Sequence, residues 1–137
     1  MSYQTEVKIG GPLPLAASAA VVALVNPAGC GVIWDAAAAN LVISGDDGSP
    51  DYIIDEIDTV NSIASVFPFS NDRNFRVRLA ASPGAVAVGK YAKSSATLGT
   101  FELGGAASDV NVGVFEDSST AGGAALVRPL AGGTVVT

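Results

Sequence analysis

Three groups of side chains in this sequence could do chemistry, and none includes histidine because the chain contains no histidine. The groups are a glycine–lysine stretch at 84–91, an acidic stretch at 46–58, and the arginines Arg73, Arg76 and Arg78. The lack of histidine excludes histidine-based acid–base catalysis, Ser-His-Asp triads and histidine-ligated metals. The Ser, Thr, Asp and Glu residues elsewhere form no pair typical of a hydrolase, so we expect no enzymatic activity.

The glycine–lysine stretch differs by one residue from a phosphate-binding loop. That loop needs Ser or Thr after its Lys to hold magnesium, whereas Tyr91 follows Lys90 here. The residues between Gly84 and Gly89 are apolar and alternating, which is typical of a strand. We therefore expect a strand at 86–91 and no nucleotide.

The acidic stretch holds six carboxylates between Asp46 and Asp58, and such oxygens could bind a calcium ion. Their spacing does not fit the twelve-residue calcium loop, because Gly48 comes too early and no Glu closes the loop. A solvated or partner-facing acidic surface accounts for these residues. We expect no cofactor and no metal, although the sequence leaves calcium at Asp46–Asp58 open.

The three arginines lie on or beside one predicted strand. The segment 75–79 alternates, which predicts an apolar face and an arginine face. Arginine pairs with carboxylates through two parallel hydrogen bonds, so these residues are either solvated or form a subunit interface. The predicted interface residues are Arg73, Arg76, Arg78, Phe67 and Phe69.

One helix is predicted among these elements, at 49–65. Ser49 can cap it, Pro50 suits its first position and Asp51 suits its first turn. The apolar residues 53, 57, 60 and 64 fall on one helical face, opposite a row of acids.

The rest of the chain predicts strands and turns. The expected strands are 3–9, 19–25, a hairpin of 31–34 with 41–44, and then 75–79, 86–91, 101–103, 112–116 and 126–128. A one-turn helix through the alanines at 36–39 is the alternative to the loop of this hairpin. A chain of 137 residues is long enough for one domain with a real core. The sequence therefore predicts a mainly β, single-domain fold over 1–137, either a β-sandwich or a β-barrel, with one amphipathic helix.

The apolar run at 13–25 and Cys30 after it are similar to the end of a bacterial lipoprotein signal. Against export, Glu6 stands beside Lys8 before the run, and prolines interrupt the run. The run is also too short to span a bilayer, so we expect buried strands and no membrane partner. Cys30, the single cysteine, is then expected to be a small buried hydrophobe.

Charge and composition favour an assembly component. The net charge of −6 is concentrated in residues 1–70, which carry eight acids against Lys8, and this argues against nucleic acid as a partner. Charged residues make up 15% of the chain, well below the roughly 25% of ordinary soluble domains. The surface must therefore be partly apolar, as at sites where another protein binds.

A further pattern lies in residues 80–130. Pro83-Gly84 precedes a Val-x-Val-Gly-x-Tyr segment, and the stretches 112–117, 121–123 and 126–128 follow. In these features the chain resembles the capsid cement (head decoration) proteins of tailed bacteriophages. The resemblance implies a protein made in the host cytoplasm and located on the capsid exterior of the virion. Its partners would be the major capsid protein and itself, as a homotrimer that bridges neighbouring capsomers.

An alternative from another class is a β-sandwich recognition module, such as a phage fibre or surface domain that binds carbohydrate. Sugar-binding faces usually stack on exposed aromatic rings. Aromatic residues make up 7% of this chain, so the sequence favours the cement protein.

Overall fold

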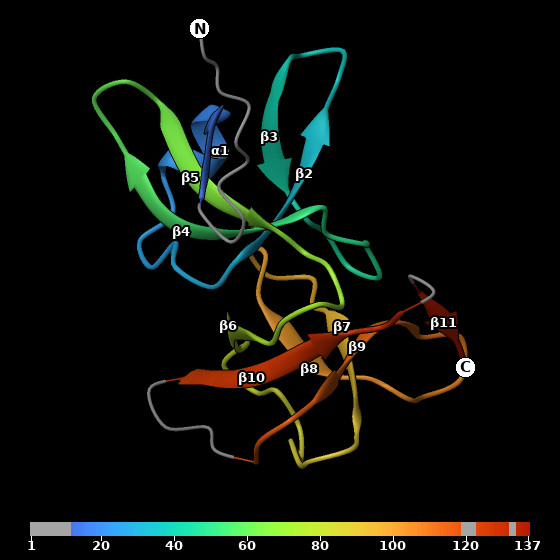
Figure 1. The fold of residues 1–137 in the computed structure, drawn as a ribbon. Coiled ribbons are helices and arrows are strands. Elements are labelled where there is room, and N and C mark those ends of the chain that lie inside the picture. Colours follow the sequence, from blue (N-terminus) through green and yellow to red (C-terminus); the bar gives the residue numbers. More distant parts are fainter. Residues whose placement is uncertain (1–11, 119–122, 132–133) are drawn as a thin grey trace, which may run out of the picture.

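Two antiparallel β-sheets account for nearly all the regular structure of the chain (Figure 1). The computed structural model describes residues 12–118, 123–131 and 134–137. The N-terminal sheet comprises β1 (Leu13–Ala16), β2 (Gly31–Asp35), β3 (Asn40–Ile43), β4 (Tyr52–Asp58) and β5 (Ile63–Pro68), in the order β1-β5-β4-β2-β3. The C-terminal sheet comprises β6 (Phe75–Arg78), β7 (Tyr91–Ser94), β8 (Phe101–Leu103), β9 (Val110–Phe115), β10 (Ala124–Pro129) and β11 (Val135–Val136). Its order is β6-β10-β9-β7-β8, and β11 pairs with β9.

The predicted mainly β fold is confirmed, in its two-sheet form. The described strands do not close into a barrel, because β1 and β3 form the edges of one sheet and β6 and β8 form the edges of the other. The predicted hairpin at 31–44 is present as β2 and β3, and the strands expected near 101, 112 and 126 are present as β8, β9 and β10. The strand expected at 3–9 lies outside the described residues.

The predicted helix at 49–65 is wrong, because this segment forms the β4–β5 hairpin. A β-bulge explains the misleading pattern. Ile54 pairs with Val66 but Glu56 pairs with Ser65, so Asp55 is an extra residue in β4. The extra residue interrupts the alternation of apolar and polar residues that is typical of a strand. The apolar residues Ile53 and Ile57, on either side of the bulge, are then four positions apart, as on one face of a helix. The Asp58 carboxylate also accepts hydrogen bonds from the next turn, a local interaction that competes with helix formation.

Two other predicted strands are also corrected. Part of the stretch at 19–25 forms the short helix α1 (Ala19–Val22), capped by Ser18, whose hydroxyl accepts from the Val21 amide at 3.4 Å. The segment at 86–90 is a loop, and β7 begins at Tyr91. Cys30 is buried with a free thiol, as predicted. In the described part of the chain no helix is long and apolar enough to cross a membrane.

Each sheet has its own hydrophobic core, and the two cores meet at β4. Consecutive residues of a strand point to opposite faces. Ile54 therefore joins the core of the N-terminal sheet, whereas Ile53 joins the core of the C-terminal sheet. Phe67 and Phe69, at the end of β5 and just beyond it, also pack against the C-terminal core.

Backbone contacts join the two sheets along a seam, which we define by Gly29, Gly31 and Gly99. The Gly29 amide donates to the Ile54 carbonyl of β4 at 2.9 Å, and its carbonyl accepts from the Arg78 amide of β6 at 2.9 Å. The Gly31 amide donates to the Gly99 carbonyl at 2.8 Å. Gly29 has a φ of +88°, and a Cβ atom there would lie 2.8 Å from the Arg78 nitrogen. The seam therefore requires a glycine at this position.

We predict that Gly29→Ala destabilises the fold more than Gly89→Ala. Gly89 has nearly the same conformation, with a φ of +86°, but an added Cβ would meet nothing within 4 Å. Both substitutions carry the left-handed penalty of about 1–2 kcal/mol, and Gly29→Ala adds a backbone clash of about 1–3 kcal/mol. Urea unfolding of both variants measures the difference. Equal losses of stability would show that the seam is not a close-packed contact.

Candidate functional site

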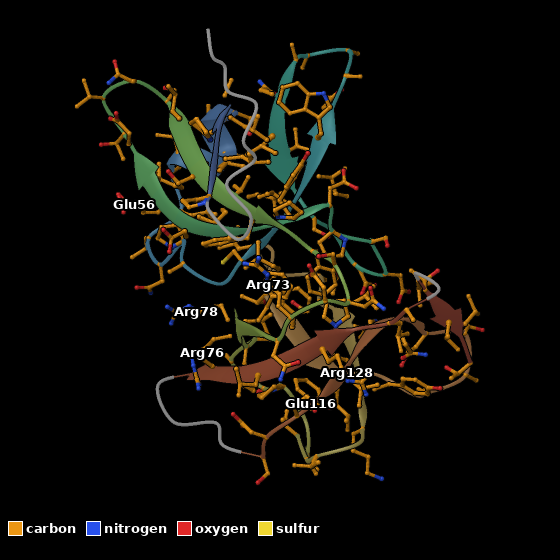
Figure 2. The ribbon with its side chains drawn as sticks, in the orientation of Figure 1. Glu56, Arg73, Arg76, Arg78, Glu116 and Arg128 are labelled. Atoms are coloured by element: carbon orange, nitrogen blue, oxygen red, sulfur yellow. The ribbon has the colours of Figure 1, made fainter. Side chains whose placement is uncertain are left out.

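A cavity of about 370 Å³ opens beside the seam, and all three predicted interface arginines line it. We call it the arginine cavity. Its walls come from Gly29, from β4 with Asp55, from Phe67 of β5 and from β6 with the residues before it. Figure 2 shows Arg73, Arg76 and Arg78 on the same side of the molecule, where the two sheets meet.

Strand β6 positions two of these arginines by simple alternation. Phe75 and Val77 are buried in the C-terminal core, so Arg76 and Arg78 lie on the opposite face. Arg76 is exposed, while Arg78 is half-buried. This is the arrangement that the sequence predicted for the segment 75–79.

Arg73 is held at the cavity by an aromatic ring. Its guanidinium carbon lies 5.5 Å from the centroid of the Phe67 ring, within the range of a cation–π contact. The ring thus supports the guanidinium while both remain at the cavity wall. Phe67 and the three arginines, four of the five predicted interface residues, are therefore brought together.

Phe69, the fifth, lies elsewhere. Its ring centroid is 5.3 Å from that of Phe75 and 6.1 Å from that of Phe101, and the residue packs against the C-terminal core. Sequence spacing alone could not separate Phe67 from Phe69. The two residues differ by two positions, but the strand ends between them.

The cavity is suited to binding an anionic group next to an apolar surface. Three arginines and one acid, Asp55, line the cavity, although the chain as a whole carries a net charge of −6. The apolar part of the wall includes Phe67 and Phe75. Guanidinium groups bind carboxylates in a bidentate, directional manner. Among its lining residues, no nucleophile is paired with a base.

The acidic stretch, by contrast, has a structural role at its N-terminal end. The Lys93 ammonium lies 3.0 Å from Asp46, 3.1 Å from Asp47, 3.5 Å from Glu102 and 3.6 Å from Asp109, and the Lys93 side chain is 8% exposed. We call this group the Lys93 cluster. It links the loop after β3 to the C-terminal sheet. No local pattern indicated this cluster, because 47 positions separate Lys93 from Asp46.

Hydrogen bonding sets the charge states in this cluster. Burial by itself lowers the pKa of Lys93, but hydrogen bonds and attraction from Asp46 and Asp47 outweigh burial and raise that pKa above its ordinary value. The Val110 amide, 3.2 Å from Asp47, and then Lys93 hold the pKa of Asp47 below its ordinary value. Lys93 and Asp47 are therefore both charged near neutral pH.

Other acids of the stretch also bind the backbone. Asp51 accepts from the Trp34 amide at 3.0 Å, and Asp58 closes the turn after β4. Among the residues that the structure describes, no group of three or more His, Cys, Asp or Glu is arranged to hold a metal ion.

One further arginine lies away from the arginine cavity. Arg128 of β10 lies 3.5 Å from Glu116, just after the neighbouring strand β9 (Figure 2). Both side chains are partly exposed, and such surface pairs contribute little to stability. Arg128 therefore provides a matched control for the cavity arginines.

Comparison with known proteins adds no identification to this geometry. Neither a family model nor a curated protein matches the chain.

We predict that Lys93→Met lowers the free energy of unfolding by about 2–3 kcal/mol at pH 7. The substitution leaves four carboxylates clustered without their cation, and their partial exposure keeps the loss below that of a fully buried pair. Lys90→Met is the control because Lys90 is exposed. Urea unfolding measures both, and equal effects would contradict a structural role for the cluster.

The difference between wild type and Lys93→Met is expected to depend on pH. The depressed pKa of Asp47 gives stability that is present above the ordinary value of 3.8 and is lost as the pH falls through the folded value. The raised pKa of Lys93 gives stability that is present below 10.5 and is lost only as the pH rises through the folded value. The difference should therefore be constant between about pH 5 and 10 and shrink in acid. A difference that grows below pH 4 would contradict this assignment.

Proposed function

We propose that this protein is a structural virion component that binds the outer surface of a phage capsid and stabilises it by bridging neighbouring capsomers, as a homotrimer. The observation that carries the proposal is the arginine cavity, a preformed cationic recognition site on a weakly charged β-scaffold. The cavity would take acidic side chains of the major capsid protein. The protein needs neither a cofactor nor a reactive side chain for this role.

The segment that resembles the cement proteins has a defined place in the structure. Residues 80–130 include β7 to β10 and thus most of the C-terminal sheet. The Val-Gly-Val stretch lies in β9, which pairs with β7, β10 and β11. The resemblance therefore concerns four strands of the C-terminal sheet, and β6 with its arginines pairs with these strands through β10.

Repeated weak contacts suffice for such a role. Burial of a few hundred Å² of apolar surface at each contact gives several kcal/mol at about 25 cal/mol per Å², before the cost of association. When one trimer engages several capsid subunits, the later contacts form at high effective concentration. Separating two capsomers then requires breaking several contacts at once.

The carbohydrate-binding alternative has one feature in its favour. Trp34 of β2 is 37% exposed. The other large hydrophobic side chains that are exposed in the described part of the chain are aliphatic. Sugar recognition commonly uses stacking aromatic faces. The partial exposure of Trp34 supports this function less than the arginine cavity supports protein binding.

We predict that the purified protein co-sediments with mature, expanded capsid shells of its own phage and not with unexpanded shells. A double variant, Arg73→Gln with Arg76→Gln, should bind at least about tenfold more weakly, because charge-assisted hydrogen bonds are worth about 1.5–3 kcal/mol each. Arg128→Gln is the control and should bind like wild type.

Three results would count against this function or this site. Unchanged shell binding by the double variant would remove the arginine cavity as the contact. Equal weakening by Arg128→Gln would indicate a general charge effect. Retention of the wild-type protein on a glycan array, without affinity for any shell, would favour the carbohydrate-binding module.

A further inference from the structure

A second cavity, of about 420 Å³, lies between α1, β3 and the loop that joins β7 to β8. We call it the α1 groove. Its lining is largely apolar, and small alanines leave room beside larger aliphatic side chains. Arg78 is the one charged residue in the lining of the groove. The apolar part of the lining comprises Ala20, Ala23, Leu24, Val25, Ile43 and Leu98.

The rim of the α1 groove exposes two large apolar side chains to water. Val25 is 90% exposed and Leu98 is 57% exposed. Leu98 also has a left-handed backbone with a φ of +47°, followed by Gly99 at +75°. The Thr100 amide donates to the Thr97 carbonyl at 2.9 Å, which closes a type I′ turn. Such turns favour Asn before Gly, so Leu98 is unfavourable both in its conformation and in its exposure.

The loop that carries Leu98 is held firmly. The Ser95 hydroxyl accepts from the Thr97 amide at 3.0 Å and lies 2.6 Å from the Thr100 hydroxyl. The Gly99 carbonyl accepts from Gly31 in the seam. The rim is therefore preformed, and a partner would lose little entropy in ordering it.

A surface that matches the α1 groove lies at the tip of the β4–β5 hairpin. Val60 at this tip is 88% exposed, although β-branched residues are uncommon in exposed turns. Asp58 accepts from the Val60 amide at 3.0 Å and from the Asn61 side chain at 2.8 Å, which fixes the turn. The hydrogen bonds from Asn61 hold the pKa of Asp58 below its ordinary value, so the carboxylate is charged.

The tip and the groove are complementary in polarity and in charge. The tip presents an aliphatic side chain beside a carboxylate, and the groove has an aliphatic wall with Arg78 among its lining residues. Figure 1 shows the hairpin tip at the end of the N-terminal sheet that is remote from the C-terminal sheet. The loop of the C-terminal sheet lines the groove. A contact between tip and groove would therefore join two molecules.

We propose that the hairpin tip of one copy of this chain docks in the α1 groove of the next copy, with Val60 against the apolar wall and Asp58 facing Arg78. The contact is head-to-tail, since the two surfaces differ, and such a contact forms a closed ring when a rotation axis, threefold in the proposed homotrimer, relates successive copies. This inference rests on the self-association part of the proposed function and names the surfaces that mediate it.

The test uses two defective variants and their mixture. Val60→Ser removes the apolar tip, and Val25→Ser with Leu98→Asn removes the rim of the groove while giving the turn its preferred residue. Sedimentation equilibrium should show at least about tenfold weaker self-association of each variant than of wild type. Urea unfolding should show that the Leu98→Asn change does not destabilise the monomer. An equimolar mixture of the two variants should form one-to-one heterodimers, because one intact tip and one intact groove remain.

Each other result overturns the contact. The contact is wrong if the wild-type protein is monomeric at every concentration. It is also wrong if the variants self-associate to the same mass as wild type, or if the mixture of variants stays monomeric. Shell binding measured on the same preparations separates this contact from the capsid role. If the wild-type protein binds shells as a monomer, the proposed contact is wrong and the capsid role stands. If it forms a stable ring that does not bind shells, the capsid role is wrong and the contact stands.

Discussion

The close approach of two backbones at the seam is the constraint on which the rest of this structure depends. Each sheet belongs to a segment of about 60 residues, a size at which a separate core gives marginal stability. Gly29 allows the loop before β2 to bond to β4 and β6 at once. Both cavities follow from this contact. Gly29 forms part of the wall of the arginine cavity, and the Gly31–Gly99 bond fixes the loop that borders the α1 groove.

The Lys93 cluster reinforces the seam by a different physical means. Close backbone packing is short-ranged and depends on shape, whereas the cluster joins the sheets through charge in a partly buried setting. A buried ion pair costs desolvation, so it often adds little net stability compared with an apolar replacement. Its value lies in specificity. Lys93 is satisfied only when the loop with Asp46 and Asp47 reaches the C-terminal sheet, so other arrangements of the sheets would leave charges unpaired.

Local patterns predicted those parts of the fold in which neighbours along the chain decide the structure. The alternation at 75–79 predicted both the strand β6 and its arginine face, and two short apolar segments on either side of residues 35–40 predicted the hairpin of β2 and β3. The pattern failed at β4, where the bulge at Asp55 made a strand resemble a helix. It also failed at α1, where Ser18 caps a helix within a run of residues that suit a strand equally well.

The candidate site was predictable in its residues but not in its shape. The sequence identified Arg73, Arg76 and Arg78 as a group because they lie within six positions. The opposite wall of the cavity comes from Gly29 and Asp55, and their approach depends on the seam rather than on any local pattern. The Lys93 cluster and the α1 groove were missed for the same reason. Both assemble from segments that only the packing of the two sheets brings together.

The position of Arg78 gives the two proposed contacts a physical relation. Arg78 lines both cavities, whereas Arg73 and Arg76 line the arginine cavity alone. A guanidinium carries a single charge, so a carboxylate that occupies one cavity reduces the positive potential that Arg78 offers to the other. Self-association would therefore leave capsid recognition to Arg73, which lies over the Phe67 ring, and to Arg76, which is exposed. The chain carries a net charge of −6, so few positive groups are available to it. With Arg78 used for the contact between copies, Arg73 and Arg76 can still attract an acidic partner.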